Sequence, residues 1–248
     1  MTGVVLDLDG VVYRGGIAVP GAGDALAVLV ERHDVVFATN NSRRTPAEVA
    51  GAIERATGVA VDPATVLTSA QAAATVADAI PTGVVGGAGI RGALAELDIP
   101  VVDLADARQV VTGIDFDLSY ETIRAASAAI RDGARWIATN TDATFPAETG
   151  LWPGAGAIVA ALAVAAGAEP EVAGKPHPPM VSLVAARVGA DAVVVGDRPE
   201  TDLALAKAGG WTSVLVLSGV TDDPATVPAE LAPDHVVRSL VDVVDLLG

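Results

Sequence analysis

The chain contains no cysteine, which excludes disulfides, thiolate metal sites and thiol nucleophiles together. Histidine is also scarce, and its three copies lie far apart in the sequence, at His33, His177 and His235. This spacing argues against a metal site built from imidazole groups. A bound metal would therefore use carboxylate and carbonyl oxygens, the ligands that Mg²⁺ and similar hard cations prefer.

Basic residues are few, with 15 lysines and arginines against 31 acidic residues and a net charge of −16. Such a balance disfavours contact with a phosphate backbone, so we expect no nucleic-acid partner. The acidic excess has two explanations, a GC-rich genome or a salt-rich cytoplasm in which ions screen the repulsion between like charges. We favour the second explanation, which makes the protein halophilic.

A long hydrophobic run is missing as well. The least polar stretch, residues 154–168, is shorter than the ~20 residues that a membrane span needs, and we interpret it as a packed helix. The first residues, MTGVVLDLDG, lack the basic start and long apolar core of a signal peptide. With 51% hydrophobic and 19% charged residues, we expect a folded cytoplasmic protein without a membrane partner.

Short apolar runs alternate with helical patterns in two separate parts of the chain, which is typical of parallel α/β folds. In the first part, the patterns predict strands at 4–6 and 35–38 and helices at 24–32 and 46–57. In the second part, they predict strands at 172–173, 192–195 and 213–217 and helices at 179–188, 200–208 and from 240 onward. The strands are rich in β-branched residues without alternation, as expected for strands buried on both faces.

Between these parts lies a segment of domain size with its own strands and helices. The strands are predicted at 84–85, 101–102, 110–111 and 136–137, and the helices at 89–97 and 120–132. We therefore expect an α/β protein in which residues 1–68 and 169–248 form a doubly wound parallel-sheet core. Residues 69–168 would form an inserted second α/β domain, and ligands would bind where the strand ends of the core face it.

Two acids follow the first predicted strand. The apolar run 3–6 places Asp7 at its carboxyl end, and because side chains alternate along a strand, Asp7 and Asp9 can face one cavity. Gly10 permits close approach of the backbone to a ligand. A turn or a helix cap is the alternative role for such a pair, but parallel sheets bind their ligands at this edge.

Thr39 ends the second predicted strand, and Asn40 and Asn41 follow it. A turn of this kind can donate hydroxyl, amide and backbone N–H bonds to an anion, although an ordinary helix cap would need only one of these groups. Arg43 and Arg44 add positive charge nearby, with solvated surface roles as the alternative. The sequence Ala-Thr-Asn recurs a hundred positions later as Ala-Thr-Asn-Thr-Asp, but the first copy is the better candidate site.

Lys175 is one of only two lysines, and the glycine and proline on either side of it restrict its loop. Asp197 ends another predicted strand, where its carboxylate can ligate a cation, and Asp202 can orient that cation's ligands. A surface lysine and an acid in the first turn of a helix are the alternative roles for Lys175 and Asp202. Together with the acids and the hydroxyl turn, these residues predict a site for Mg²⁺ and a phosphate group.

The segments DLDGVVYRG, ATNNS, GKP and GDRPETD, in this order and at these separations, resemble the four motifs of the haloacid dehalogenase superfamily. The insertion between the second and third motifs, with ATNTD and PGAGA, resembles that of its type IIA subgroup, the NagD-like and p-nitrophenylphosphatase-like phosphatases. Family dehalogenases lack an acid at the position of Asp9. The resemblance therefore implies Mg²⁺-dependent hydrolysis of small phosphate monoesters rather than displacement of halide.

The resemblance also implies a role for each motif. Asp7 would be the nucleophile that forms an aspartyl-phosphate, and Asp9 would protonate the leaving oxygen and then activate water. Thr39, Asn40 and Lys175 would hold the phosphoryl oxygens. The ligands of Mg²⁺ would be the carboxylate of Asp7, the backbone carbonyl of Asp9 and the carboxylate of Asp197. Asp202 and Asn41 would have supporting roles.

In that family, the insertion is a cap that closes over the site. Its specificity loop would correspond here to a segment containing Asp142, Thr144 and Phe145, with core packing as the alternative for Phe145. This loop carries no positive cluster, so we expect a small leaving group or one with apolar parts. Family members often form homodimers through the cap, which makes a second copy of this chain a partner by resemblance.

Two other functions compete with the phosphatase. A phosphotransferase or phosphomutase of the same fold would use the same residues but exclude water from the intermediate. A phosphate-binding module without turnover would keep the fold alone, although the presence of Asp9 and Lys175 speaks against it. In each case the partner is a small phosphorylated metabolite, whose identity the sequence leaves open.

Overall fold

The computed structural model describes residues 2–147 and 149–248. Within these residues, the larger sheet has six parallel strands in the order β14-β13-β12-β1-β4-β5. They are β1 (Gly3–Leu6), β4 (Asp34–Thr39), β5 (Val66–Thr68), β12 (Val193–Gly196), β13 (Thr212–Val216) and β14 (His235–Val237). The chain builds the sheet outward from β1 in both directions, which confirms the doubly wound core.

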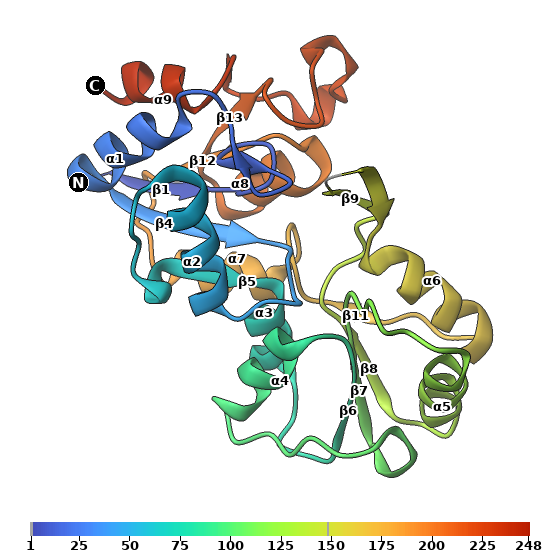
Figure 1. Ribbon diagram of the computed structural model, residues 1–248. Coiled ribbons are helices and arrows are strands. Elements are labelled where there is room, and N and C mark those ends of the chain that lie inside the picture. Colours follow the sequence, from blue (N-terminus) through green and yellow to red (C-terminus); the bar gives the residue numbers. More distant parts are fainter. Residues whose placement is uncertain (1, 148) are drawn as a thin grey trace.

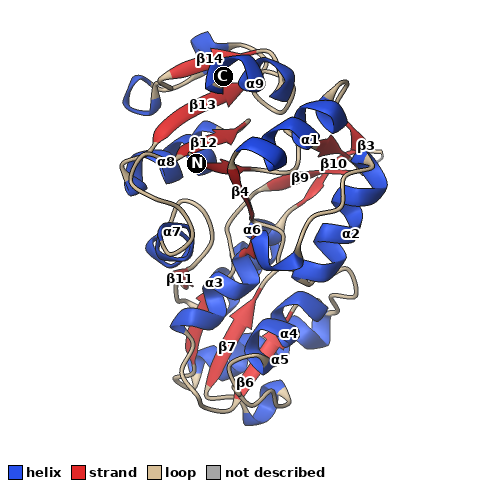
Figure 2. Ribbon diagram, turned by 90° about the vertical axis from the view of Figure 1, so that its left-hand side faces the viewer, coloured by secondary structure: helices blue, strands red, loops and turns tan. Residues whose placement is uncertain are grey.

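Alternate residues of the central strand β1 face opposite sides of this sheet. Val4 and Leu6 pack with Leu26 of one helical layer, whereas Val5 packs with Met180 of the other. The first layer consists of α1 (Ala22–Arg32), α2 (Pro46–Thr57) and α9 (Leu240–Leu247), and the second of α3 (Ser69–Val76), α7 (Pro178–Ala185) and α8 (Ala204–Gly209). Figure 2 shows α1 and α7 on opposite sides of the sheet.

A smaller parallel sheet, in the order β11-β8-β7-β6, forms the centre of an inserted α/β cap (Figure 1). Its strands are β6 (Thr82–Val85), β7 (Gln109–Thr112), β8 (Arg135–Ala138) and β11 (Glu171–Val172). The cap also contains α4 (Ala88–Ala95), α5 (Tyr120–Arg131), α6 (Ala155–Ala166) and an antiparallel hairpin of β9 (Thr144–Ala147) and β10 (Gly150–Pro153). The predicted α/β insertion is thereby confirmed as a fold, and α6 agrees with the packed helix expected over 154–168.

Two strand predictions were wrong. The strand expected at 172–173 as part of the core is β11, which pairs with β8 of the smaller sheet, Val172 lying opposite Ala138. The strand expected at 101–102 is a single bridge between Val101 and Thr82. Apolar β-branched residues indicate extended backbone, but which sheet a short strand joins depends on tertiary packing. The limits 69–168 for the inserted domain stay a prediction.

Local signals explain why other elements agree closely with their predictions. Helix α2 begins after a capping box in which Thr45 and Glu48 bond each other's backbone N–H groups, and Pro46 occupies its first turn. It ends at Gly58, whose φ of 77° is left-handed. Both ends of α2 therefore match the helix predicted over 46–57.

Several short elements had no strong sequence signal. A two-stranded hairpin, β2 (Tyr13–Arg14) and β3 (Ile17–Ala18), follows the first motif. Single 3₁₀ turns occur at Pro63–Thr65, Leu104–Asp106, Pro224–Thr226 and Ala229–Leu231. In the part of the chain that the structure describes, every helix is too short or too polar to cross a membrane.

Candidate active site

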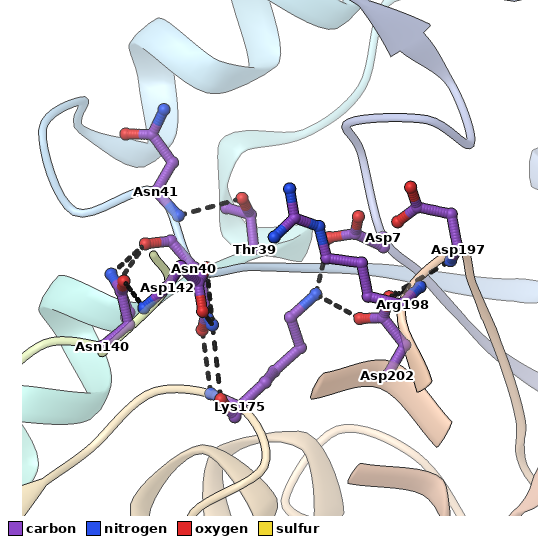
Figure 3. A network of polar contacts seen from close by, with 11 residues as sticks. Asp7, Thr39, Asn40, Asn41, Asn140, Asp142, Lys175, Asp197, Arg198 and Asp202 are labelled. Carbon is purple, nitrogen blue, oxygen red and sulfur yellow. Dashed lines mark hydrogen bonds and ion pairs between the residues drawn. The ribbon is translucent and has the colours of Figure 1, made fainter. Parts of the chain in front are cut away.

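Four motifs of the sequence meet at the carboxyl ends of the strands of the larger sheet (Figure 3). Asp7 directly follows β1, and its backbone N–H donates to the carbonyl of Val195 at 2.9 Å. Asp197 follows β12, and Thr39 is the last residue of β4. Lys175 reaches the same point from the loop between β11 and α7. Parallel strands bring their carboxyl ends together, so residues far apart in sequence share one site.

The ammonium group of Lys175 lies between two carboxylates. Its Nζ donates to Asp7 Oδ1 at 2.6 Å and to Asp202 Oδ1 at 2.7 Å. The lysine is only 5% exposed. Burial lowers the pKa of Lys175, but attraction to Asp202 and Asp7 outweighs it and leaves the pKa raised. Lys175 therefore stays charged inside the protein.

Asp202 uses both of its carboxylate oxygens in contacts within the protein. Oδ1 accepts from Lys175, and Oδ2 accepts the N–H groups of Asp197 at 3.2 Å and Arg198 at 3.1 Å. A π-helical turn over Pro199–Leu203 brings this carboxylate back toward the end of β12. The arrangement suits a residue that orients its neighbours, as the sequence predicted for Asp202.

Asp197 has one carboxylate oxygen left open. Oδ2 accepts the N–H of Val220 at 2.6 Å, whereas Oδ1 is buried and has no hydrogen-bond partner among the described residues. Burial and the nearby carboxylate of Asp202 raise the pKa of Asp197 to about 7. A buried polar atom without a partner is costly, so a ligand at this oxygen would stabilise the site.

The surroundings of this open oxygen fit a divalent cation. Carboxylate oxygens of Asp7, Asp197 and Asp202 lie within 4.8 Å of one another. These three acids share a single lysine, and burial raises the pKa of Asp7 well above its usual range. A hard cation would satisfy the open oxygen and offset the excess of negative charge, and the donor set consists of the oxygens that it prefers.

Asp9 lies two residues beyond Asp7, with Tyr13 paired to it by a β-bridge. Burial raises the pKa of Asp9 to about 6, and the positive charges of Arg44 and Lys175 oppose part of this rise. Burial and the charge of Asp9 raise the pKa of Tyr13 as well. A carboxyl group with a pKa near neutrality can hold a proton at physiological pH, which is what a general acid must do.

The turn after β4 is ordered by its own polar groups. Thr39 Oγ1 accepts the N–H of Asn41 at 3.1 Å. Asn41 Oδ1 in turn accepts the N–H groups of Arg43 at 3.0 Å and Arg44 at 3.2 Å. Thr39 keeps its hydroxyl hydrogen for another acceptor, and both Thr39 and Asn41 line the cavity described below. Asn41 therefore holds the turn in place, which is compatible with its predicted supporting role.

The side chain of Asn40 joins the core to the cap. Its Oδ1 accepts the backbone N–H of Lys175 at 2.9 Å, and its Nδ2 donates to the carboxylate oxygens of Asp142 at 3.1 and 3.2 Å. Asn140 donates to the carbonyl of Asn40 at 2.7 Å. The two copies of the Ala-Thr-Asn sequence thus meet across the junction. The predicted phosphate contact of Asn40 stays a prediction, because its amide group already has these partners.

A cavity of about 510 Å³ extends between the core and the cap, and Asp7, Asp9 and Lys175 line it. The three residues expected in the specificity loop are also among its lining: Asp142, Thr144 and Phe145. This volume lies in the range of small-molecule sites, roughly 300–1,000 Å³. The structure therefore brings together at one cavity the reactive groups of the core and the predicted loop of the cap.

Sequence reasoning missed several residues of this cavity, namely Tyr13, Arg55, Phe116, Trp152 and Arg198. Phe116, Phe145 and Trp152 form a cluster with ring centroids 6.0 to 6.2 Å apart. Phe116 is 52% exposed and Trp152 44% exposed. Aromatic residues make up only 3% of the sequence, and this rarity was the one signal that could have marked Phe116 and Trp152 as candidate residues of the cavity.

Comparison with known proteins agrees with this geometry. A model of the haloacid dehalogenase-like hydrolase family matches residues 4–100, and a second, HAD-hydrolase-like model matches residues 172–243. A dihydroxyacetone phosphatase of Corynebacterium glutamicum is 34% identical over 96% of this chain and 89% of its own length. The p-nitrophenyl phosphatase of Archaeoglobus fulgidus is 31% identical, covers 99% of this chain and 98% of its own, and superposes with a TM-score of 0.88.

A further solved structure holds a metal. The glycerol phosphate phosphatase of Mycobacterium tuberculosis in complex with magnesium is 35% identical over 96% of this chain and 74% of its own, with a TM-score of 0.88. A structure of the same relative in complex with calcium has also been solved. Fold, site and relatives agree on one class, the phosphatases that have a cap inserted in a parallel-sheet α/β core. The chain belongs to the haloacid dehalogenase-like hydrolases, in their type IIA group of phosphatases.

Proposed function

We propose that this chain hydrolyses small phosphate monoesters with Mg²⁺ through an aspartyl-phosphate intermediate. The observation that carries the proposal is the buried cluster around Lys175, whose Nζ lies 2.6 Å from Asp7 Oδ1 beside the open oxygen of Asp197. A nucleophilic carboxylate, a fixed positive charge and a place for a cation are the groups that phosphoryl transfer needs. The names of the relatives, which are phosphatases of glycerol phosphate, dihydroxyacetone phosphate and p-nitrophenyl phosphate, support the same class.

In the first step, a carboxylate oxygen of Asp7 attacks phosphorus, and the bond between phosphorus and the ester oxygen breaks. The departing oxygen takes its proton from Asp9, whose pKa of about 6 lets it hold one near neutrality. In the second step, water attacks the phosphorus of the aspartyl-phosphate and gives its proton to Asp9. The bond to Asp7 then breaks, which releases inorganic phosphate and restores both carboxyl groups.

Other residues hold the phosphoryl group during these steps. The Nζ of Lys175 already contacts Asp7, so it would neutralise charge on the phosphoryl oxygens next to the attacking atom. The free hydroxyl hydrogen of Thr39 would donate to another of these oxygens. For Asn40 the donor would be the backbone N–H, because the side-chain amide bonds Asp142 and Lys175. Asn41 would keep the turn in this conformation.

The cation would be held by the carboxylates of Asp7 and Asp197 and by the backbone carbonyl of Asp9. Asp202 would orient Asp197, because its Oδ2 accepts the backbone N–H of Asp197 at 3.2 Å. When bound, Mg²⁺ supplies positive charge that offsets the repulsion between an anionic nucleophile and an anionic substrate. The open Oδ1 of Asp197 supports its place in this set. Without the cation, Asp7 and Asp197 gain protons more easily, since burial raises the pKa of each.

The cap would select the leaving group. Asp142, Thr144 and Phe145 line the cavity. The limits expected for this domain, 69–168, would exclude β11, so we propose that it extends to about residue 172. Asp142 is partly buried and bonded to Asn40, so it would position the loop relative to the phosphate site. A homodimer through the cap and a cytoplasmic location are part of the same proposal.

The test measures phosphate release from p-nitrophenyl phosphate, glycerol 3-phosphate, dihydroxyacetone phosphate and a nucleoside 5′-monophosphate. Each substrate is assayed with Mg²⁺ or EDTA, at low and molar KCl, for the wild type and Asp7→Asn. We expect release that needs Mg²⁺ and disappears in Asp7→Asn. Phosphate passing to an added alcohol or sugar instead of water would favour the phosphotransferase. No release and no transfer under any condition would leave only phosphate binding.

A further inference from the structure

Three arginines meet where the active-site cavity joins a second one. Arg43 and Arg44 follow the turn after β4, and Arg55 lies on α2. All three line both the cavity that holds Asp7 and Asp9 and an adjoining cavity of about 420 Å³, which contains neither acid. Positive charge is scarce in this chain, which has a net charge of −16. Its concentration at the junction of two cavities therefore needs a reason beyond solubility.

A contact with an aromatic ring holds Arg43 over the cavity, and Arg55 lies along its own helix. The guanidinium carbon of Arg43 lies 4.6 Å from the centroid of the Phe116 ring, a cation–π contact across the junction between core and cap. A guanidinium nitrogen of Arg55 lies 3.2 Å from where a Cβ on Gly51 would be. The Arg55 side chain thus runs back along α2 toward its first turn, over a position where a larger residue would crowd it.

In the part of the chain that the structure describes, these arginines form no ion pair with an acidic side chain. Within residues 2–147 and 149–248, the ion pairs involve other basic residues. Three acids also line the adjoining cavity, Glu48, Asp115 and Asp117. The hydrogen bond from the Thr45 backbone lowers the pKa of Glu48, and the charges of Arg44 and Arg43 contribute to this lowering. Glu48 accepts the N–H of Thr45 at 2.8 Å, and Asp115 accepts the N–H of Asp117 at 3.0 Å. Guanidinium groups with unused donors are suited to a carboxylate or phosphate, which they bind through two parallel hydrogen bonds.

We propose that Arg43, Arg44 and Arg55 form a second anion subsite, which deepens the proposed phosphatase function and rests on it. Preferred substrates are phosphate monoesters whose leaving group carries a further anionic group, a carboxylate or a second phosphate. The transferred phosphoryl group lies at Asp7, and the other anionic group lies at the arginines. From the specificity loop alone, the sequence predicted a small leaving group or one with apolar parts. An anionic leaving group replaces that prediction, because the positive charge comes from the core and not from the specificity loop.

The test uses pairs of substrates that differ in one charged group. For a carboxylate, 3-phosphoglycerate is compared with glycerol 3-phosphate, and for a phosphate, fructose 1,6-bisphosphate with fructose 6-phosphate. We expect the doubly anionic member of at least one pair to have the higher kcat/KM. Arg55→Gln should lower that kcat/KM about tenfold through KM, with less than a twofold change for the singly anionic member.

Arg91→Gln is the matched control, because Arg91 is an exposed arginine on α4 that lines neither cavity. It makes the same change of net charge and should leave both members of each pair unaffected. Equal kcat/KM within both pairs, or an equal loss for both members in Arg55→Gln, would overturn the subsite. The pair that responds identifies the carboxylate or the phosphate as the second group.

Binding to Asp7→Asn, measured by calorimetry, separates this inference from the proposed function. The variant should bind 3-phosphoglycerate or fructose 1,6-bisphosphate about tenfold more tightly than its singly anionic counterpart, and adding Arg55→Gln should remove the difference. If the wild type releases no phosphate but this preference persists, the phosphatase proposal fails and the subsite stands. Equal affinities within each pair would refute the subsite whatever the turnover.

Discussion

Replacing Lys175 by methionine tests whether the buried cluster depends on one positive charge. The lysine is 5% exposed, and its Nζ bonds Asp7 at 2.6 Å and Asp202 at 2.7 Å. Methionine has a similar volume but removes the positive charge and leaves Asp7 Oδ1 and Asp202 Oδ1 without their shared donor. Removing one member of a buried ion pair costs about 3–5 kcal/mol. We expect the free energy of unfolding of Lys175→Met to fall by about this amount in EDTA, and phosphate release to be lost.

Urea unfolding followed by tryptophan fluorescence measures this change. The double variant Lys175→Met/Asp202→Asn is the control, because it removes one of the two stranded charges along with the lysine. It should be about 1–2 kcal/mol more stable than Lys175→Met, although it lacks one more native group. A loss below about 1 kcal/mol in Lys175→Met, or a double variant less stable than the single one, would refute the reasoning.

Three further predictions concern the cation, the surface and the junction. Mg²⁺ at a hundredfold excess over its Kd should stabilise the wild type by about 2.7 kcal/mol in thermal unfolding, and Asp197→Asn should lose most of this gain. Hydrogen bonds from Ser213 lower the pKa of Asp234, so its stabilisation is present above the unfolded pKa and is lost as the pH falls through the lower folded value. Because Asp234 is exposed and water screens its charge, the difference in unfolding free energy between the wild type and Asp234→Ala should be below about 1 kcal/mol at pH 6 and should shrink below about pH 4, and a difference independent of pH would contradict this. A Cβ on Gly174 would lie 2.4 Å from the carbonyl oxygen of Thr139, so Gly174→Ala should cost about 1–3 kcal/mol in urea unfolding and reduce activity, whereas Gly189→Ala, with open space around it, should not.

Parts of the fold with complete local signals could be predicted closely. The capping box at Thr45 and Glu48 and the left-handed Gly58 define both ends of α2 without reference to the rest of the molecule. The buried β-branched runs likewise predicted β1 and β4. The short strand at Glu171–Val172 was also expected from its apolar residues, but its pairing with β8 rather than with the core sheet depends on how the cap packs. Short strands are specified by their neighbours rather than by their own residues.

Parts of the candidate site divide in the same way. The strand before Lys175, β11, belongs to the smaller sheet, so an argument from strand ends does not account for the place of Lys175 in the site. The motif acids could be placed together from sequence because they follow strands of one parallel sheet, and such strands end at one edge. The partners of Asn40 could not, because its amide meets Asp142 from a segment a hundred residues away. Arg55 could not either, since nothing in the pattern of α2 shows that its side chain turns toward a cavity.

By itself, the sequence determined the fold class, the four motifs and the identity of the groups that can react, because these depend on local patterns and on chemical type. Only the tertiary structure decided which of those groups touch. It left Asp197 Oδ1 without a partner among the described residues, joined Asn40 to Asn140 and gathered the arginines of the core beside Phe116 of the cap. Contacts between segments distant in the chain arise from packing in three dimensions, and no local pattern in the sequence records them.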